Sequence, residues 1–242
     1  MNNTALSFDG LSPPRKATRG GAGAHIFTVL REAIVSLELK PGQILDKQIL
    51  AERFGVSRAP IYDAFTKLEA EGLVDVFPQR GTTVSLIRIS TARESMFLRR
   101  AIEVEAVRTI TRNFSGSHLE SLKQNLRYQT ASVQSGDATG FHRFDLEFHA
   151  LLIDALGFER VKTSVETARL GLERIRRLLN SRRRQEITLQ EHQAIVEAIG
   201  QRNANAAAAA MAAHLDSVMT ELESFAKAHP ELFADLQTKA DA

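Results

Sequence analysis

The chain has 242 residues, of which 43% are hydrophobic and 25% are charged, and this balance excludes a chain that is disordered throughout. It contains no cysteine, which excludes disulfide bridges, thiolate zinc fingers and a cysteine nucleophile, so any metal site must use histidines and carboxylates. The formal net charge of +2 at pH 7 is too small to indicate nucleic-acid binding by itself. Because no apolar run approaches the roughly 18 residues of a membrane span and the N-terminus lacks a signal-peptide pattern, we expect a cytoplasmic protein that contacts no membrane.

The first part of the chain predicts a tail followed by three helices. Residues 1–22 have few apolar side chains and no periodicity, which predicts a flexible tail. Apolar residues at helical spacing over 26–37 predict an amphipathic helix that ends at Lys40-Pro41-Gly42. A short helix near 47–54 follows, and Ser57 is expected to cap a third helix after the turn Gly55-Val56-Ser57.

Two short segments rich in β-forming residues come next. Residues 73–77 and 82–87 flank the turn Pro78-Gln79-Arg80-Gly81, and this pattern predicts a β-hairpin. Three helices followed by a hairpin is the element order of a winged helix-turn-helix, which we place at 23–89.

Beyond residue 89 the strand pattern disappears and long helical patterns follow. We therefore predict a mainly α protein: an N-terminal winged helix-turn-helix with a small β-hairpin wing, then a C-terminal all-α six-helix bundle over 90–230 and a C-terminal tail over 231–242. The expected helices cover 91–113, 117–134, 138–156, 160–182, 188–201 and 203–227.

The turn before the third helix carries the residues that we expect to contact DNA. In a helix-turn-helix the N-terminal end of the recognition helix meets base edges in the major groove, and arginine suits the paired acceptors of guanine, so Arg58 is the first candidate. The alternative is that these are ordinary solvated surface residues. The predicted DNA-contacting set is Gln48, Ser57, Arg58, Tyr62 and Lys67, with Arg80 and Gly81 at the tip of the wing.

Asp145 and His149 are four residues apart, so both side chains reach one point beside a helix. His192 and His214 each lie on an otherwise apolar helix face. These four groups could converge as one carboxylate and three imidazoles around a divalent ion, with positions left open for water or a ligand. The alternatives are hydrogen-bonded core histidines and, for the first two residues, a surface ion pair.

A basic cluster lies near the end of the expected helix 160–182. We interpret it as a solvated helix C-terminus, with the alternative that one inward-turning arginine contacts an effector. Its members are Arg174, Arg176, Arg177, Arg182, Arg183 and Arg184.

Three stretches carry a family resemblance. Residues 37–42, 50–60 and 68–74 resemble the DNA-binding domain of GntR-family bacterial transcription regulators, and residues 91–226 are similar to the FCD ligand-sensing domain of the FadR subfamily. The short distance between the wing and Met96 resembles the six-helix, VanR-like branch. The chain departs from the family at Tyr62, where arginine is usual, and at Gly157-Phe158, where asparagine often follows the glycine.

The resemblance implies a metal held by Asp145, His149, His192 and His214, and an effector-binding Arg99, which could otherwise simply pair with Glu103 on the same helix. Imidazole ligands favour zinc or nickel, with manganese also compatible, and a guanidinium beside a metal suits a small carboxylate effector.

We therefore expect a homodimeric, ligand-responsive transcription regulator, a repressor, that binds an inverted-repeat operator in double-stranded DNA. The competing hypotheses are a metal-dependent enzyme, for which no separate general base is evident, and a sensor of the metal itself.

Overall fold

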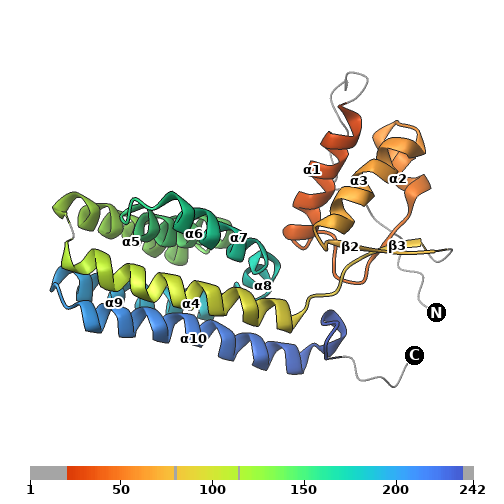
Figure 1. The fold of residues 1–242 in the computed structure, drawn as a ribbon. Coiled ribbons are helices and arrows are strands. Elements are labelled where there is room, and N and C mark those ends of the chain that lie inside the picture. Colours follow the sequence, from red (N-terminus) through yellow and green to blue (C-terminus); the bar gives the residue numbers. More distant parts are fainter. Residues whose placement is uncertain (1–20, 79–80, 114, 237–242) are drawn as a thin grey trace. The chain divides into compact units, whose positions relative to one another are not determined.

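The structure, a computed structural model, describes residues 21–78, 81–113 and 115–236. The described residues form two compact units (Figure 1): the first contains the chain up to Ile87 and again from Glu231, and the second contains Arg88–Pro230. Residues 1–20 of the expected N-terminal tail and 237–242 of the expected C-terminal tail lie outside the described residues.

The first unit has the predicted helix-turn-helix. Its helices are α1 (Ala22–Val35), α2 (Lys47–Phe54) and α3 (Arg58–Ala70). The Asp46 side chain caps α2 by accepting hydrogen bonds from two backbone N–H groups of its first turn. Gly55 then ends α2 with a φ of +63°, a left-handed conformation that costs glycine little, and so makes the sharp turn into α3.

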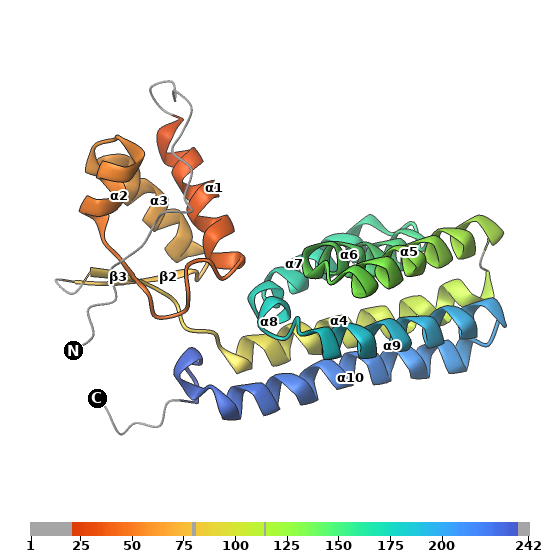
Figure 2. The same ribbon diagram turned by 180° about the vertical axis from the view of Figure 1, so that it is seen from behind.

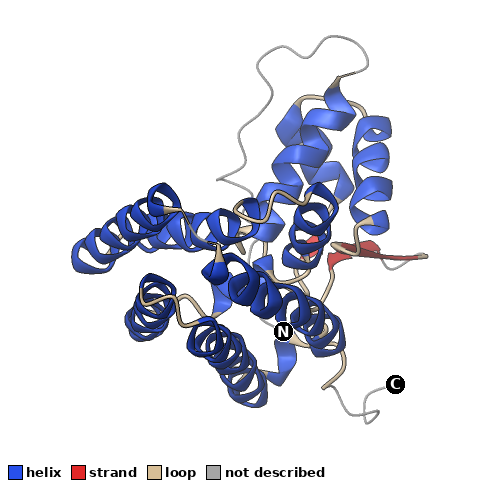
Figure 3. Cartoon of the chain, turned by 60° about the vertical axis from the view of Figure 1, so that its left-hand side comes forward, coloured by secondary structure: helices blue, strands red, loops and turns tan. Residues whose placement is uncertain are grey.

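A small antiparallel sheet follows α3, and the expected wing is present in it. Strands β2 (Val74–Phe77) and β3 (Gly81–Val84) form the hairpin, and β1 (Ile44–Leu45) pairs with the other edge of β3, giving the order β1-β3-β2. The sequence analysis does not anticipate β1, because two residues are too few to show an alternating pattern. Figure 3 shows all described strands, in red, gathered at this sheet.

The core of the first unit consists of apolar side chains from the three helices and the sheet. This core explains why the exposed faces of α2 and α3 are free to carry polar residues. It comprises Ile26, Leu30, Ala33, Ile34, Leu39, Leu45, Leu50, Ala51, Phe54, Ile61, Ala64, Phe65, Leu68, Val74 and Val84.

The segment after residue 230, which the sequence analysis expects to be a tail, belongs to the first unit over its described residues. Phe233 is fully buried and forms a parallel bridge with Ile87, whose N–H donates to the Leu232 carbonyl and whose carbonyl accepts from the Ala234 N–H. The segment that ends the first part of this unit, at Ile87, is therefore hydrogen-bonded to the segment that returns to it after residue 230.

The second unit is entirely helical in its described residues (Figures 1 and 2). Its first and last helices pack along each other, the last also packs on α9, and α5 packs on α6. The bounds are α4 (Ile89–Arg112), α5 (Gly116–Ser135), α6 (Ala138–Asp154), α7 (Glu159–Leu170), α8 (Glu173–Leu178), α9 (Arg182–Gly200) and α10 (Ala204–Ala228).

The helix expected over 160–182 is divided in the structure. It breaks at Gly171 and Leu172 into α7 and α8, and α9 begins at Arg182, where the Ser181 side chain accepts a hydrogen bond from the Arg184 N–H. The described residues of this unit therefore form seven helices instead of six. The break matters because α8 brings arginines inward.

The interior of the second unit contains many polar side chains at its centre. Buried groups of this kind need partners inside the protein, so they predict a site more strongly than an apolar core would. They include Arg99, Glu103, Gln129, His142, Asp145, His149, Arg174, Arg184, Gln185, His192 and His214. No described helix combines the length and apolar character that crossing a membrane requires.

Candidate functional site

The exposed face around the start of α3 is the candidate DNA-reading surface. Arg58, the first residue of α3, is exposed, and its Nη2 donates a 2.9 Å hydrogen bond to Oε1 of Gln48 on α2. The Gln48 amide in turn donates to Glu52 at 3.2 Å. This chain of hydrogen bonds holds the guanidinium at the turn between the two helices.

Three further candidates lie on α3 or directly before it. Tyr62 is 51% exposed and the Lys47 ammonium stands 4.4 Å from its ring centroid, so a cation is already associated with this tyrosine. Ser57 occupies the capping position of α3, but its side chain makes no capping hydrogen bond, contrary to our expectation. Lys67 is exposed in the last turn.

The wing supplies Gly81, which begins β3 with a φ of +98°, a conformation that side chains other than glycine rarely adopt. Arg80, the other expected contact at the wing, lies outside the described residues.

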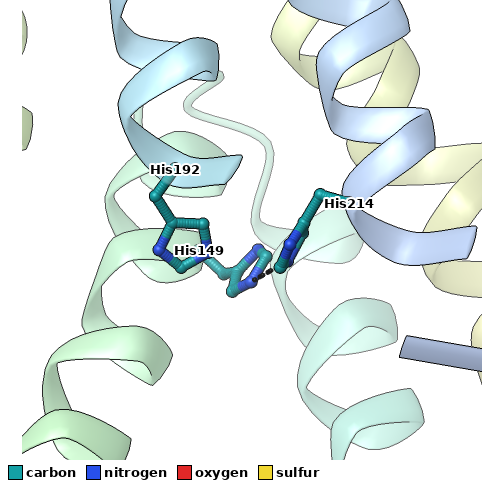
Figure 4. A group of neighbouring side chains, drawn as sticks. All are labelled: His149, His192 and His214. Atoms are coloured by element: carbon teal, nitrogen blue, oxygen red, sulfur yellow. Dashed lines mark hydrogen bonds between the residues drawn. The ribbon is translucent and has the colours of Figure 1, made fainter. Parts of the chain in front are cut away.

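Three histidines meet at the centre of the second unit (Figure 4). His149 comes from α6, His192 from α9 and His214 from α10, and each offers a ring nitrogen within 4.8 Å of the others. His149 and His192 are fully buried and His214 is 2% exposed. Helices distant in sequence thus direct three imidazoles to one point.

A side-chain oxygen lies close to the Nδ1 atom of each of these rings. His149 Nδ1 lies 2.7 Å from Glu103 Oε2 and His214 Nδ1 lies 2.8 Å from Glu191 Oε2. His192 Nδ1 lies 2.9 Å from Gln129 Oε1. An acceptor at Nδ1 fixes the proton there and leaves Nε2 as a lone-pair donor, which is the arrangement that orients histidine ligands in metal sites.

The Nε2 atoms turn toward one another. His149 Nε2 and His214 Nε2 are 3.3 Å apart, and His192 Nε2 is buried without a hydrogen-bond partner. A buried polar atom without a partner is costly, and an ion between the rings would satisfy all three nitrogens. These residues therefore fit a divalent metal ion.

Burial sets the protonation of the three rings. It lowers the pKa of His149 to about 3, although Glu103 acts in the opposite direction. Burial, and then His214, hold the pKa of His192 well below its usual value, and burial lowers the pKa of His214 against the effect of Glu191. At neutral pH the imidazoles are uncharged, which is the form that binds a metal.

Asp145 stands beside this cluster. Its Oδ1 is 3.7 Å from His192 Nε2 and 3.9 Å from His149 Nε2, while its Oδ2 contacts Nη2 of Arg176. The carboxylate thus faces the histidines on one side and an arginine on the other.

A cavity of about 60 Å³ adjoins these residues, with room for a few water molecules. Its polar lining includes Arg99, Asp145, Arg176, Arg184 and His214.

Arg99 lines the cavity and also pairs with Glu103 on the same helix, which is the alternative that the sequence analysis left open. Its Nε donates to Glu103 Oε1 at 2.6 Å, and both side chains are 2% exposed. Burial alone would raise the pKa of Glu103, but Arg99 and His149 outweigh it and hold that pKa well below its usual value. Arg100 is instead exposed and pairs with Asp216.

The interpretation of the basic cluster as a solvated helix end is wrong for several of its members. Arg174 and Arg184 are buried, and the Arg176 side chain is only 11% exposed, whereas the Arg182 side chain is 67% exposed. Arg184 pairs with Glu191 at 2.6 Å and donates to Ser217. α8 begins after the break at Gly171, and its Arg176 lines the cavity.

The sequence analysis did not find the groups that hold the histidines. Glu103 lies four residues after Arg99, so helix spacing already indicated their contact. The sequence did not indicate the contacts of Glu191 and Gln129, because each residue contacts a histidine on another helix.

The comparisons with known proteins agree with this architecture. Residues 22–84 match the gntR family of bacterial regulatory proteins, and residues 94–217 match the FCD domain. The HTH-type transcriptional repressor RspR of Escherichia coli K12 is 28% identical over 212 residues, which cover 87% of this chain and 93% of that protein. An uncharacterized HTH-type transcriptional regulator in an unstable DNA locus of Streptomyces ambofaciens is 32% identical over 210 residues, covering 86% and 88% of the two chains.

Solved structures share the fold at lower identity. Escherichia coli McbR/YncC has a TM-score of 0.65 at 17% identity, covering 84% of this chain and 98% of that one. Listeria monocytogenes Lar has a TM-score of 0.61 at 18% identity, covering 87% and 99%. With a helix-turn-helix and a helical domain that both match, the chain belongs to the GntR family of bacterial transcription regulators and carries an FCD domain.

Proposed function

We propose that this regulator is a repressor whose FCD domain binds a divalent metal ion and a small carboxylate effector, and whose affinity for DNA depends on that effector. One observation carries the proposal: three buried imidazoles, each with a side-chain oxygen close to its Nδ1 atom, meet at one point beside a cavity lined by arginines.

The metal site would use His149, His192 and His214, with Asp145 as the fourth ligand. Three neutral imidazoles and a carboxylate favour zinc or nickel, with manganese also compatible, and such a set leaves coordination positions for an effector oxygen. The ion would act as a Lewis acid that binds the effector. The chain belongs to a family of regulators and not of enzymes.

A carboxylate effector fits the charge of the cavity. Guanidinium groups bind carboxylates through two parallel hydrogen bonds, and arginines line the cavity. Ligand binding changes DNA affinity only if the two DNA-affinity states bind the ligand differently.

On the DNA side, we infer that the chain acts as a homodimer on an inverted repeat, because two recognition helices one DNA turn apart read matching half-sites. Arg58 would contact base edges, Gln48, Ser57, Tyr62 and Lys67 would make further DNA contacts from the helix-turn-helix, and Gly81 would do so from the wing. Within the family, the short connection of four residues between β3 and α4 favours the VanR-like branch, whereas the seven helices described in the second unit differ from the six of that branch.

Elemental analysis of the purified protein tests the metal site. We expect about one divalent ion per chain, lost in the His192→Ala, His214→Ala double variant and kept in His118→Ala, which changes an exposed histidine. Metal retained undiminished in the double variant would contradict the assignment. DNA affinity that follows metal concentration without any acid would make the ion itself the effector.

Titration with operator DNA at fixed salt tests the DNA-reading surface. Arg58→Ala should weaken binding by about 1–3 kcal/mol if Arg58 makes a two-bond contact to guanine. The matched control is Arg108→Ala, which removes a surface arginine of the second unit that pairs with Glu105. Equal affinity of the Arg58 variant and wild type would remove Arg58 from the base-reading role.

A further inference from the structure

Two side chains of the first turn of α2 reach across to exposed side chains of α3. Gln48 accepts a hydrogen bond from Arg58, and its neighbour Lys47 places its ammonium 4.4 Å from the ring centroid of Tyr62. Arg58 and Tyr62 are four residues apart on α3, so they lie on the same face of that helix. Lys47, the first residue of α2, therefore lies beside the candidate DNA-reading surface.

The Lys47 ammonium is held by aromatic rings and not by a carboxylate. Besides Tyr62, it has the ring centroid of Phe65 at 5.9 Å. No described carboxylate forms an ion pair with Lys47, whereas the exposed Lys123 of the second unit pairs with Glu120. An aromatic ring attracts a cation without neutralising it, so the full charge of Lys47 remains available to an anion from outside.

The backbone at the start of α2 is already occupied. The Asp46 carboxylate accepts hydrogen bonds from the N–H groups of Gln48 and Ile49. Free N–H groups at a helix N-terminus are a common phosphate site, but a phosphate here would meet a carboxylate in their place. Lys47 is therefore the group of this turn that can attract a phosphate.

The position of Lys47 suits the DNA backbone more than the bases. In a helix-turn-helix the helix before the turn crosses the backbone while the recognition helix lies in the major groove. Lys47 begins the former helix, and Tyr62 lies about one turn further along the recognition helix than Arg58. A lysine already held between the two helices loses less side-chain freedom on binding than an unrestrained one does.

We propose that Lys47 contacts a DNA phosphate and that Tyr62, in addition to its own contact, is the positioning residue that holds Lys47 for it. This inference rests on the proposed DNA-reading surface and adds Lys47 to the residues that bind DNA. A phosphate contact carries no base information, so it strengthens binding to all sequences and fixes α3 over the groove in which Arg58 reads.

Titration of the full-length protein with two duplexes tests the phosphate contact. Wild-type protein selects one duplex from a pool of random sequences, and the other is an unselected duplex of mixed sequence. We expect Lys47→Gln to weaken binding to both by a similar factor, about three- to tenfold at about 0.1 M salt, and to lower the salt dependence by about one counterion per chain. The matched control is Lys123→Gln. Unchanged affinity and salt dependence, or a loss confined to the selected duplex, would overturn the proposal.

A double-mutant cycle on the selected duplex tests the role of Tyr62. Tyr62→Leu removes the ring, so the factor by which it weakens binding should be about threefold smaller in the Lys47→Gln background than in wild type. Tyr62→Phe keeps a ring and should retain most of the coupling to Lys47. Equal effects of Tyr62→Leu in the two backgrounds, or a Tyr62→Phe variant that loses the coupling as well, would overturn the positioning role.

The outcomes separate this inference from the proposed DNA-reading surface. If Arg58→Ala weakens binding to the selected duplex and Lys47→Gln does not, the surface stands and the inference is wrong. If neither substitution weakens binding, or if wild type selects no sequence, the proposed surface is wrong together with the inference. Circular dichroism establishes that each variant is folded, and Tyr62→Ala makes the same comparison if Tyr62→Leu fails to fold.

Discussion

The two units of this chain place their candidate functional side chains in opposite environments. In the first unit, Arg58, Tyr62 and Lys67 lie exposed on helices whose inner faces form an apolar core. In the second unit, the candidate ligands and their partners are themselves buried at the centre of the helical bundle. We infer that DNA contacts can be changed at little cost in stability, whereas changes at the metal and effector site also change the folding free energy.

The largest expected effect is that of breaking the buried pair of Arg99 and Glu103. Arg99→Met leaves the Glu103 carboxylate buried with its main charge partner removed, so we expect the free energy of unfolding to fall by about 3–5 kcal/mol. Thermal and denaturant unfolding followed by circular dichroism measure this. The control is Arg100→Met, one position along α4, whose exposed pair with Asp216 should contribute less than about 1 kcal/mol. Similar losses in the two variants would remove the contrast between buried and exposed sites.

The first unit should respond strongly only where its own core is changed. Phe233→Ala removes a fully buried ring that comes from the end of the chain, and we expect a cost of about 3 kcal/mol to that unit. Hydrogen exchange over α1 and α3 should accelerate. Leu236→Ala, which changes a side chain that is 37% exposed, should leave the exchange rates nearly as they are. Unchanged exchange in the Phe233 variant would show that the C-terminal segment does not support the DNA-binding unit.

Acid should destabilise the second unit through its buried histidines. Their pKa values lie below the ordinary value of about 6.5 in the folded protein, so the unfolded chain binds more protons below that pH. In metal-free protein the free energy of unfolding should therefore fall as pH drops from about 6.5 toward 4.5, by about 1 kcal/mol per pH unit for each histidine. His149→Gln should reduce the slope, whereas His118→Gln should not. A flat profile in wild type would contradict the neutral, buried state of the rings.

The smallest effect is expected from a single exposed side chain on the candidate DNA-reading surface. Lys67→Ala removes one exposed charge from α3, so it should weaken DNA binding to all sequences alike and lower the salt dependence by about one counterion. The melting temperature should not change. Lys227→Ala, at the end of α10, is the control for loss of a lysine elsewhere. An unaltered salt dependence would place Lys67 outside the DNA contact.

Much of the fold followed from periodicity in the sequence. The helix-turn-helix, the wing and the helical nature of the second unit are all present, because long amphipathic stripes and turn residues are local signals. The strand β1 was missed because Ile44 and Leu45 gain their pairing only from β3. The division of the expected helix 160–182 was missed because a single glycine in a helical pattern does not by itself end a helix.

The candidate site was less accessible from sequence than the fold. Spacing and resemblance pointed to Asp145 and the three histidines, but the acceptors at their Nδ1 atoms come from tertiary packing. The basic cluster shows the same limit. Arg182 and Arg184 are two residues apart, and helix rotation leaves one exposed and buries the other.

X-ray absorption spectroscopy at the zinc edge of the zinc-loaded protein tests the central claim most directly, because it reports the ligands of the ion. The account predicts scattering from three imidazole rings together with oxygen ligands, and fewer imidazoles in the His192→Ala, His214→Ala double variant. A zinc environment made only of oxygen, or one that the double variant leaves unchanged, would contradict a metal site at His149, His192 and His214.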